Sequence, residues 1–295
     1  MRGNPEAYQL IAATSLTDAL TRLAEEPGAW TLIAGGTELM VAHAAGRLNA
    51  QKLMSLSTVR ELSFMRVEPH WISIGGGTTF GQIRRHAAIA SDFPLLTQSA
   101  GWIGSIANQN RATLAGNIVN GSPAADAPPA LLVYDAEIEL ISQRESRRIP
   151  YADFHLGYKQ SVLERDELVL AVHLPRRFDN HVEYLRKVGT RNAMAITKVA
   201  LAATAIVAGG RIAEIRLAAA SLADRPVRLT ATEAVLLGKA LSPETRTAAR
   251  TALLNEVRPI DDIRSTALYR SHVAANLLDE FLDTVDQRPA EELIA

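Results

Sequence analysis

The sequence contains no cysteine among its 295 residues. Disulfides, cysteine-ligated zinc and iron–sulfur clusters held by this chain are therefore excluded. An excess of charge of one sign is also lacking, because 31 Lys and Arg stand against 32 Asp and Glu, for a formal net charge of −1. This balance argues against a general binder of nucleic acid or of membrane surfaces.

Long hydrophobic runs are absent as well. The N-terminus MRGNPEAYQLIAAT has no apolar signal core, and the longest stretch of small apolar residues, 193–210, contains Lys198 and ends in Gly209-Gly210. Neither segment is long or apolar enough to predict a membrane span. We therefore expect a cytoplasmic protein.

The composition is that of a chain with a core, since 47% of the residues are hydrophobic and 21% are charged. Its length suffices for two domains of ordinary size or one large domain. The charged connector 174–181 (LPRRFDNH) is the candidate boundary, and we expect a frayed tail over the last eight residues. Hydrophobic periodicity predicts helices over 15–26, 229–237, 243–257 and 267–282, and a further helix that carries Ile83, His86 and Ala87. Short apolar runs predict strands over 30–34 and 71–74, and turn residues between such runs predict hairpins over 136–152 and 199–219.

Three glycine-rich segments follow apolar runs or lie between them: 34–38 (AGGTE), 75–79 (GGGTT) and 113–117 (TLAGN). Glycine permits close backbone approach, and consecutive N–H groups with Thr hydroxyls can cradle phosphate oxygens. None of the three matches the dinucleotide fingerprint or the phosphate-loop motif. Each alone is more often a tight turn, but together they favour a ligand site.

The segment 115–131 (AGNIVNGSPAADAPPAL) is predicted to be neither helix nor strand, because glycine and proline interrupt it throughout. It fits a wall of a binding site, in which Asn117, Ser122 and Asp126 offer polar groups to hydroxyls or a ribityl chain. A proline-rich linker between domains is the alternative. Asp135, just before a strand, is expected to face solvent.

The motifs IAGGTELM, IGGGTTFGQI and IGSIANQNRATLAGNIVNGSPAADAPPALLVYDAEIEL resemble the FAD-binding subunit of molybdenum hydroxylases, as do KVGTR and DIRSTALYR further on. This group includes the medium chain of carbon monoxide dehydrogenase and the flavin domain of xanthine dehydrogenase. The resemblance covers essentially the whole chain. It implies an α+β fold, with an FAD-binding domain of the PCMH type over 1–176 (two α/β subdomains, about 1–57 and 58–176). A C-terminal domain over 182–288 follows, with an antiparallel sheet and a helical bundle.

The resemblance also implies a set of non-covalent FAD contacts. The first loop would bind the pyrophosphate through its backbone, the third loop would meet the diphosphate and ribityl groups, and Asp126 would contact a polar part of the flavin chain. Val169 and Leu170 would lie by the isoalloxazine, and a cation at Lys187 would favour the charge of the reduced ring. The full set is Leu32, Ile33, Ala34, Gly35, Gly36, Thr37, Glu38, Thr79, Thr113, Leu114, Ala115, Gly116, Asn117, Ser122, Asp126, Val169, Leu170 and Lys187.

Two departures from the family pattern stand out: Ala115 occupies the place of a second Gly, and Asn108-Gln109 replace an apolar–Arg pair. Arg84-Arg85 is interpreted as a solvated helix face. No metal site is expected in this chain, because its seven histidines share no ligand spacing: His43, His70, His86, His155, His173, His181 and His272.

The predicted function is that of a flavoprotein subunit without catalytic residues of its own. The resemblance implies that a molybdopterin cofactor on a large partner chain and 2Fe-2S clusters on a small partner chain would pass electrons to FAD here, and that an external acceptor would receive them. The assembly would be a dimer of heterotrimers. A self-contained FAD oxidoreductase with its own substrate pocket is the rival hypothesis, and a scaffold chain whose loops are only turns is the third. The segments GYKQSVL and ITKVALA resemble those of xanthine-dehydrogenase-type relatives, and this resemblance favours an N-heterocycle as the substrate. The electron acceptor (NAD, oxygen, quinone or cytochrome) stays open.

Overall fold

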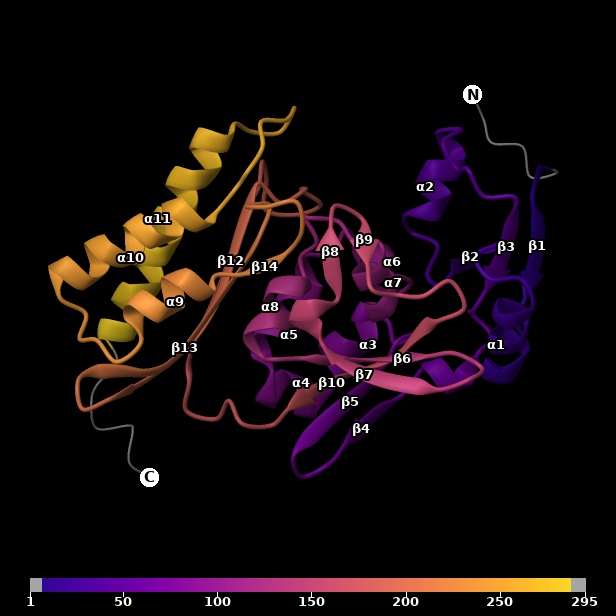
Figure 1. Ribbon diagram of the computed structural model, residues 1–295, viewed down its shortest axis with the longest axis horizontal. Helices are drawn as coiled ribbons and strands as arrows, with labels where there is room; N and C mark the ends of the chain where they lie inside the picture. The colour runs from indigo at the N-terminus through magenta and orange to yellow at the C-terminus, as the bar shows by residue number, and fades with distance from the viewer. Residues whose placement is uncertain (1–6, 288–295) are drawn as a thin grey trace.

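The three larger of the four sheets in the described residues follow one another along the long axis of the molecule (Figure 1). The computed structural model describes residues 7–287, so the expected frayed tail lies outside the described residues. Within the described part of the chain, no helix is long and apolar enough to cross a membrane. The mixture of helices and strands, with a C-terminal antiparallel sheet beneath helices, confirms the predicted fold class.

The N-terminal sheet is parallel, with the order β1-β3-β2, at the right of Figure 1. Its elements are β1 (Gln9–Ala12), α1 (Leu16–Glu25), β2 (Trp30–Ile33), α2 (Leu39–Ala44) and β3 (Lys52–Ser55). The Ser15 side chain caps α1 by accepting the N–H of Asp18, and Ala19, Leu20 and Leu23 are buried on one face. The helix and the strand that were expected here are confirmed.

The central sheet is antiparallel, with the order β4-β5-β10-β6-β7. Its strands are β4 (Met65–Val67), β5 (Trp71–Gly75), β6 (Glu137–Ile141), β7 (Ser146–Pro150) and β10 (Leu168–Pro175). The turns and helices around it are η2 (Arg60–Leu62), α3 (Phe80–Arg85), α4 (Ala87–Asp92), α5 (Pro94–Trp102), α6 (Ile106–Gln109), α7 (Leu114–Val119), α8 (Pro128–Val133) and η3 (Tyr151–Asp153), with a small hairpin of β8 (His155–Gly157) and β9 (Gln160–Ser161). One helix was expected after the second glycine loop, but the structure has two, α3 and α4, because the backbone of His86 is extended and separates them.

The prediction that 115–131 holds no helix is wrong at both of its ends. Helix α7 contains Gly116 in its first turn, where the Thr113 side chain accepts the glycine N–H. Helix α8 begins at Pro128-Pro129, and proline is tolerated in the first turn because its missing N–H has no helical partner there. The linker alternative is also excluded, since every residue of α8 is buried.

The C-terminal sheet is buried on both faces (Figure 1). Leu185, Ala202 and Ala218 face the core of the central region, whereas the alternate residues face the helices on the other side. The sheet has the order β11-β12-β13-β14, and its elements are β11 (Val182–Val188), β12 (Val199–Ala208), β13 (Arg211–Ala220), β14 (Val227–Arg228), α9 (Thr230–Leu236), α10 (Pro243–Glu256) and α11 (Ala267–Asp286). The expected hairpin and three helices are confirmed.

Asp135 does not face solvent freely, contrary to expectation. It adopts a positive φ of 48° after α8, and its carboxylate accepts from Arg177, Arg216 and Arg228. These arginines come from the connector and from two strands of the C-terminal sheet. The sequence did not reveal this role, because the three partners lie 42 to 93 residues away.

Candidate functional site

A cavity of about 1000 Å³ lies between the N-terminal and central sheets. Residues of all three glycine loops line it, together with apolar residues of both regions, such as Leu62 and Leu168. The second and third loops are joined by backbone hydrogen bonds from Leu114 to Thr78 O (3.0 Å) and from Ala115 to Gly76 O (3.0 Å). The fold therefore brings three separate sequence motifs to one place.

The first loop offers unpaired backbone donors to this cavity. The N–H groups of Gly35, Gly36 and Thr37 donate no hydrogen bond to any of the described residues, and all three residues line the cavity. Gly36 has a φ of +73°, which lets the chain turn sharply between β2 and α2. Successive free N–H groups in such a turn form a concave site for an anion.

Contact with Arg111, two residues before the third loop, fixes the position of the first loop. A Cβ on Gly35 would lie 1.9 Å from the carbonyl oxygen of Arg111, so only glycine fits. The Arg111 side chain returns across the loop, and its Nε donates to Gly35 O at 3.2 Å. The second loop is held as tightly, since a Cβ on Gly76 would lie 2.4 Å from Val169 O.

One buried polar atom at the cavity has no partner. Asn117 lines the cavity, and its Oδ1 is buried without a hydrogen bond to any described residue. An orphaned buried acceptor costs about 1–3 kcal/mol. A ligand donor reaching Asn117 would remove this cost.

Most of the residues predicted to contact a cofactor are brought together here. The predicted residues that line the cavity are Leu32, Ala34, Gly35, Gly36, Thr37, Glu38, Thr79, Thr113, Ala115, Gly116, Asn117 and Val169. The predicted residues that do not line it are Ile33, Leu114, Ser122, Asp126, Leu170 and Lys187. Leu114 is fully buried, and the Leu170 carbonyl accepts from Gly76 N–H at 2.8 Å while the Leu170 side chain packs against the hydrophobic cluster of the N-terminal region.

Lys187 and Asp126 form a pair with each other. Lys187 Nζ lies 2.8 Å from Asp126 Oδ2, and Thr197 donates to Oδ1 at 2.6 Å. Burial raises the pKa of Asp126 above its usual range, although Lys187 and Thr197 act in the opposite direction. The pair therefore ties the segment after α7 to the C-terminal sheet.

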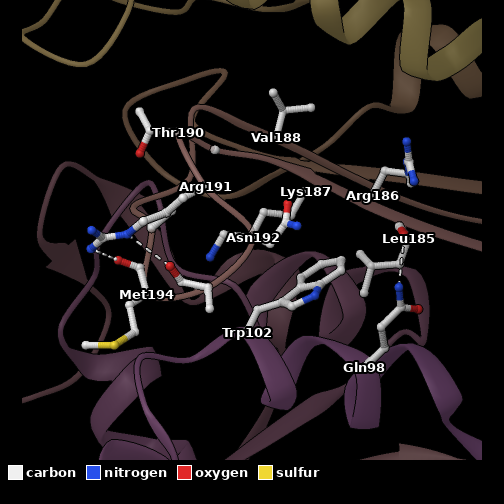
Figure 2. Close-up of a pocket in the computed structure, with 13 residues that line it drawn as sticks. Gln98, Trp102, Leu185, Arg186, Lys187, Val188, Thr190, Arg191, Asn192 and Met194 are labelled. Carbon is white, nitrogen blue, oxygen red and sulfur yellow. Dashed lines mark hydrogen bonds between the residues drawn. The ribbon is translucent and has the colours of Figure 1, made fainter.

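A second cavity, of about 490 Å³, lies beside Lys187 (Figure 2). Gln98 and Trp102 of α5 line one side of it, while the end of β11 and the following loop, 189–195, line the other. Arg191 holds this loop through its own guanidinium, which donates to the carbonyls of Ala193 (3.0 Å) and Met194 (2.7 Å). These two hydrogen bonds hold the loop in a folded conformation next to the Asp126–Lys187 ion pair.

Residues 6–177 match the family described as "FAD binding domain in molybdopterin dehydrogenase". Residues 184–285 match "CO dehydrogenase flavoprotein C-terminal domain". The chain belongs to the FAD-binding medium subunits of the molybdenum hydroxylases. The family that the sequence motifs indicated is thereby confirmed.

The relatives match this chain over most of its length. The xanthine dehydrogenase FAD-binding subunit of Escherichia coli is 31% identical over 263 residues, which is 88% of this chain and 90% of the relative. The carbon monoxide dehydrogenase medium chain of Hydrogenophaga pseudoflava is 25% identical over 293 residues, covering 97% and 99%. Among solved structures, carbon monoxide dehydrogenase from Hydrogenophaga pseudoflava superposes with a TM-score of 0.90 at 26% identity, over 95% of this chain and 98% of that one.

The cavity of this FAD-binding subunit suits FAD on physical grounds. Free N–H groups of the first loop match a diphosphate, the orphaned Asn117 Oδ1 matches a hydroxyl or ring donor, and the apolar walls match flat rings. Among residues 7–287, no group of three His, Cys, Asp or Glu side chains could hold a metal ion.

Sequence reasoning missed several polar residues of the cavity, which are Gln82, Arg85, Asn110, Arg111, Asn120 and Arg165. Arg84 and Arg85 were interpreted as a solvated helix face. Arg85 is exposed but also lines the cavity, whereas Arg84 donates a hydrogen bond to Gln109 Oε1 at 2.6 Å. Arg111 lies within the third sequence motif, two residues before Thr113. Its position within that motif was the sequence signal that could have indicated its place at the cavity.

Proposed function

We propose that this chain is the flavin-carrying electron relay of a molybdenum hydroxylase, which passes electrons from 2Fe-2S clusters of a small partner chain through FAD to an external acceptor. The observation that carries the proposal is the convergence of the three glycine loops on one large cavity with unpaired N–H donors. FAD, when bound, supplies the redox chemistry. The protein supplies the diphosphate cradle, the loop contacts that hold it and a shielded place for the ring.

The proposal extends to the division of the chain and to its contacts with FAD. We propose an FAD-binding domain over 1–176 with subdomains of about 1–57 and 58–176, and a C-terminal domain over 182–288. The eighteen residues named from the sequence remain the proposed FAD contacts. For Lys187, proximity to the flavin ring stays a prediction, and its pairing with Asp126 already neutralises much of its charge.

The proposed assembly contains a large molybdopterin-binding chain and a small 2Fe-2S chain, as a dimer of heterotrimers. Relatives named as medium chains or FAD subunits support it, among them those of xanthine, nicotinate and carbon monoxide dehydrogenases. We further propose an N-heterocycle as the substrate of the large chain, supported by relatives named for xanthine, nicotinate and caffeine. Each of those names describes the relative alone.

The test is a reduction experiment on the FAD-loaded chain without its partners. Under anaerobic conditions with purines, pyridines or aldehydes, the flavin absorbance should stay that of the oxidised form. Adding both partner chains should bleach it with one of these substrates. Bleaching by the lone chain would instead establish the rival, a self-contained FAD oxidoreductase with its own substrate pocket.

A further inference from the structure

The cavity contains more positive charge than its own carboxylates neutralise. Three arginines line it without an ion pair to any described residue, namely Arg85, Arg111 and Arg165. Of the three lining glutamates, Glu164 pairs with Arg144 and Glu167 pairs with Arg147, and both of these arginines lie outside the lining. Glu38 alone among the lining carboxylates has no ion pair within the described residues.

Arg111 is the arginine that lies against the first glycine loop. Its Nε donates to Gly35 O at 3.2 Å, and its own carbonyl occupies the space where a Gly35 side chain would lie. Its two terminal nitrogens donate to no described residue. The guanidinium is thus anchored by one N–H, with two donor groups free beside the unpaired N–H groups of the loop.

Arg85 also lines the cavity and lies near Asn110, the residue before Arg111. Its Nη1 is 3.4 Å, and Asn110 Oδ1 is 2.4 Å, from the position of a Cβ on Gly81. Asn110 precedes Arg111 and also lines the cavity. Two guanidinium groups without an ion pair to any described residue therefore line the cavity, and one of them, that of Arg111, lies against the first loop.

We propose that Arg111, supported by Arg85, is the cationic half of the diphosphate site and makes binding selective for the phosphorylated flavin. The inference rests on FAD occupying this cavity. Backbone N–H groups carry only partial charge, whereas a diphosphate diester is dianionic, and guanidinium donors form its strongest hydrogen bonds. The loop with Arg111 thus supplies both the shape and the counter-charge.

The experiment measures ligand affinity of the full-length chain after removal of its flavin, in wild type and in Arg111→Gln. FAD is compared with riboflavin, which lacks the diphosphate, and with ADP, which lacks the flavin. We expect the Kd of FAD and of ADP to rise about tenfold in Arg111→Gln, as for a lost charge-assisted hydrogen bond. Riboflavin affinity should stay within about twofold, and the salt dependence of FAD binding should become shallower.

Three further variants separate charge from structure. Arg111→Lys should recover most of the FAD affinity, and Arg85→Gln should weaken FAD and ADP by a smaller factor in the same pattern. Arg211→Gln makes the same change of net charge in the C-terminal hairpin, outside the cavity, and should change nothing. Equal losses for FAD, ADP and riboflavin would show that Arg111 only supports the loop, and unchanged FAD affinity with unchanged salt dependence would refute the proposal outright. A wild-type chain that binds no flavin would instead refute the site itself.

Discussion

Replacing Gly35 with alanine should disrupt FAD binding more than any other single methyl addition to the first loop. The added Cβ would lie 1.9 Å from Arg111 O and 2.5 Å from Arg111 C, where contacts under 3.0 Å are not tolerated. Both opposing atoms belong to the backbone, so no side-chain rotation relieves the clash. The two loops must separate by about 1 Å, a displacement that can cost about a hundredfold where geometry is decisive.

The expected magnitude follows from the donors that such a shift misplaces. The loop presents three free N–H groups to the cavity, those of Gly35, Gly36 and Thr37. A hydrogen bond to a charged group contributes about 1.5–3 kcal/mol. Losing two of them would cost about 3–6 kcal/mol, or roughly 10²- to 10⁴-fold in the Kd of FAD.

Gly36→Ala is the informative comparison. A Cβ there would meet only Ile33 and Met40 side chains at 3.6 Å, which is ordinary contact, so its cost comes from the φ of +73° and amounts to about 1–2 kcal/mol. Gly101→Ala in α5 is the control, since its nearest neighbour would be the Arg84 side chain at 3.6 Å.

The assay is a fluorescence titration of FAD into flavin-free variants, with circular dichroism to check the fold. The Kd should increase in the order Gly101→Ala, Gly36→Ala, Gly35→Ala. If Gly35→Ala retains flavin through gel filtration as well as Gly101→Ala does, the contact between the first loop and Arg111 does not shape the site.

Three other predictions follow. Gly36→Val adds a β-branched side chain at positive φ and should abolish FAD retention while the C-terminal domain stays folded; a full flavin spectrum after gel filtration would contradict it. Lys187→Met leaves the Asp126 carboxylate buried without its cation and should lower the free energy of unfolding by about 3–5 kcal/mol, whereas Asp153→Ala, an exposed control, should not change it. Although burial acts to raise the pKa of Asp262, N–H groups of Arg264 and Ser265 and the Arg270 guanidinium lower it from 3.8 to about 2. The stabilisation from this lowered pKa is complete above about pH 4 and is lost as the pH falls toward 2. The melting temperature of the Asp262→Asn variant should therefore change less between pH 4 and pH 2 than that of the wild type; equal changes in the two proteins would refute the reasoning.

The local elements were predictable because each depends on neighbours in the sequence. Ser15 begins α1 through its own side chain, and Gly209-Gly210 allow the β12–β13 turn because both adopt positive φ. The loops 34–38 and 75–79 were visible for the same reason, as glycines directly after apolar strands.

What the sequence could not show was long-range pairing and its effect on local rules. Asp135 looks like a solvent-facing turn residue until β13, β14 and the connector bring three arginines to it. Pro128 and Pro129 look like helix breakers until the structure places them in a first turn. Arg111 looks like part of a motif, and its role depends on a contact with Gly35, 76 residues earlier.

Contacts between distant residues also connect the C-terminal region to the larger cavity. Asn117 lines the cavity, and the chain that leaves α7 reaches Asp126, which is held by Lys187 and Thr197 of the C-terminal region. Ser221 N–H donates to Pro123 O at 2.7 Å in the same segment, and Ser221 itself has a φ of +64°. Three contacts between distant parts of the chain therefore fix residues 123–126, which follow the third glycine loop. Since a binding loop is only as well placed as the residues that hold it, we expect the C-terminal region to support the proposed FAD site through this segment, although its residues do not line the larger cavity.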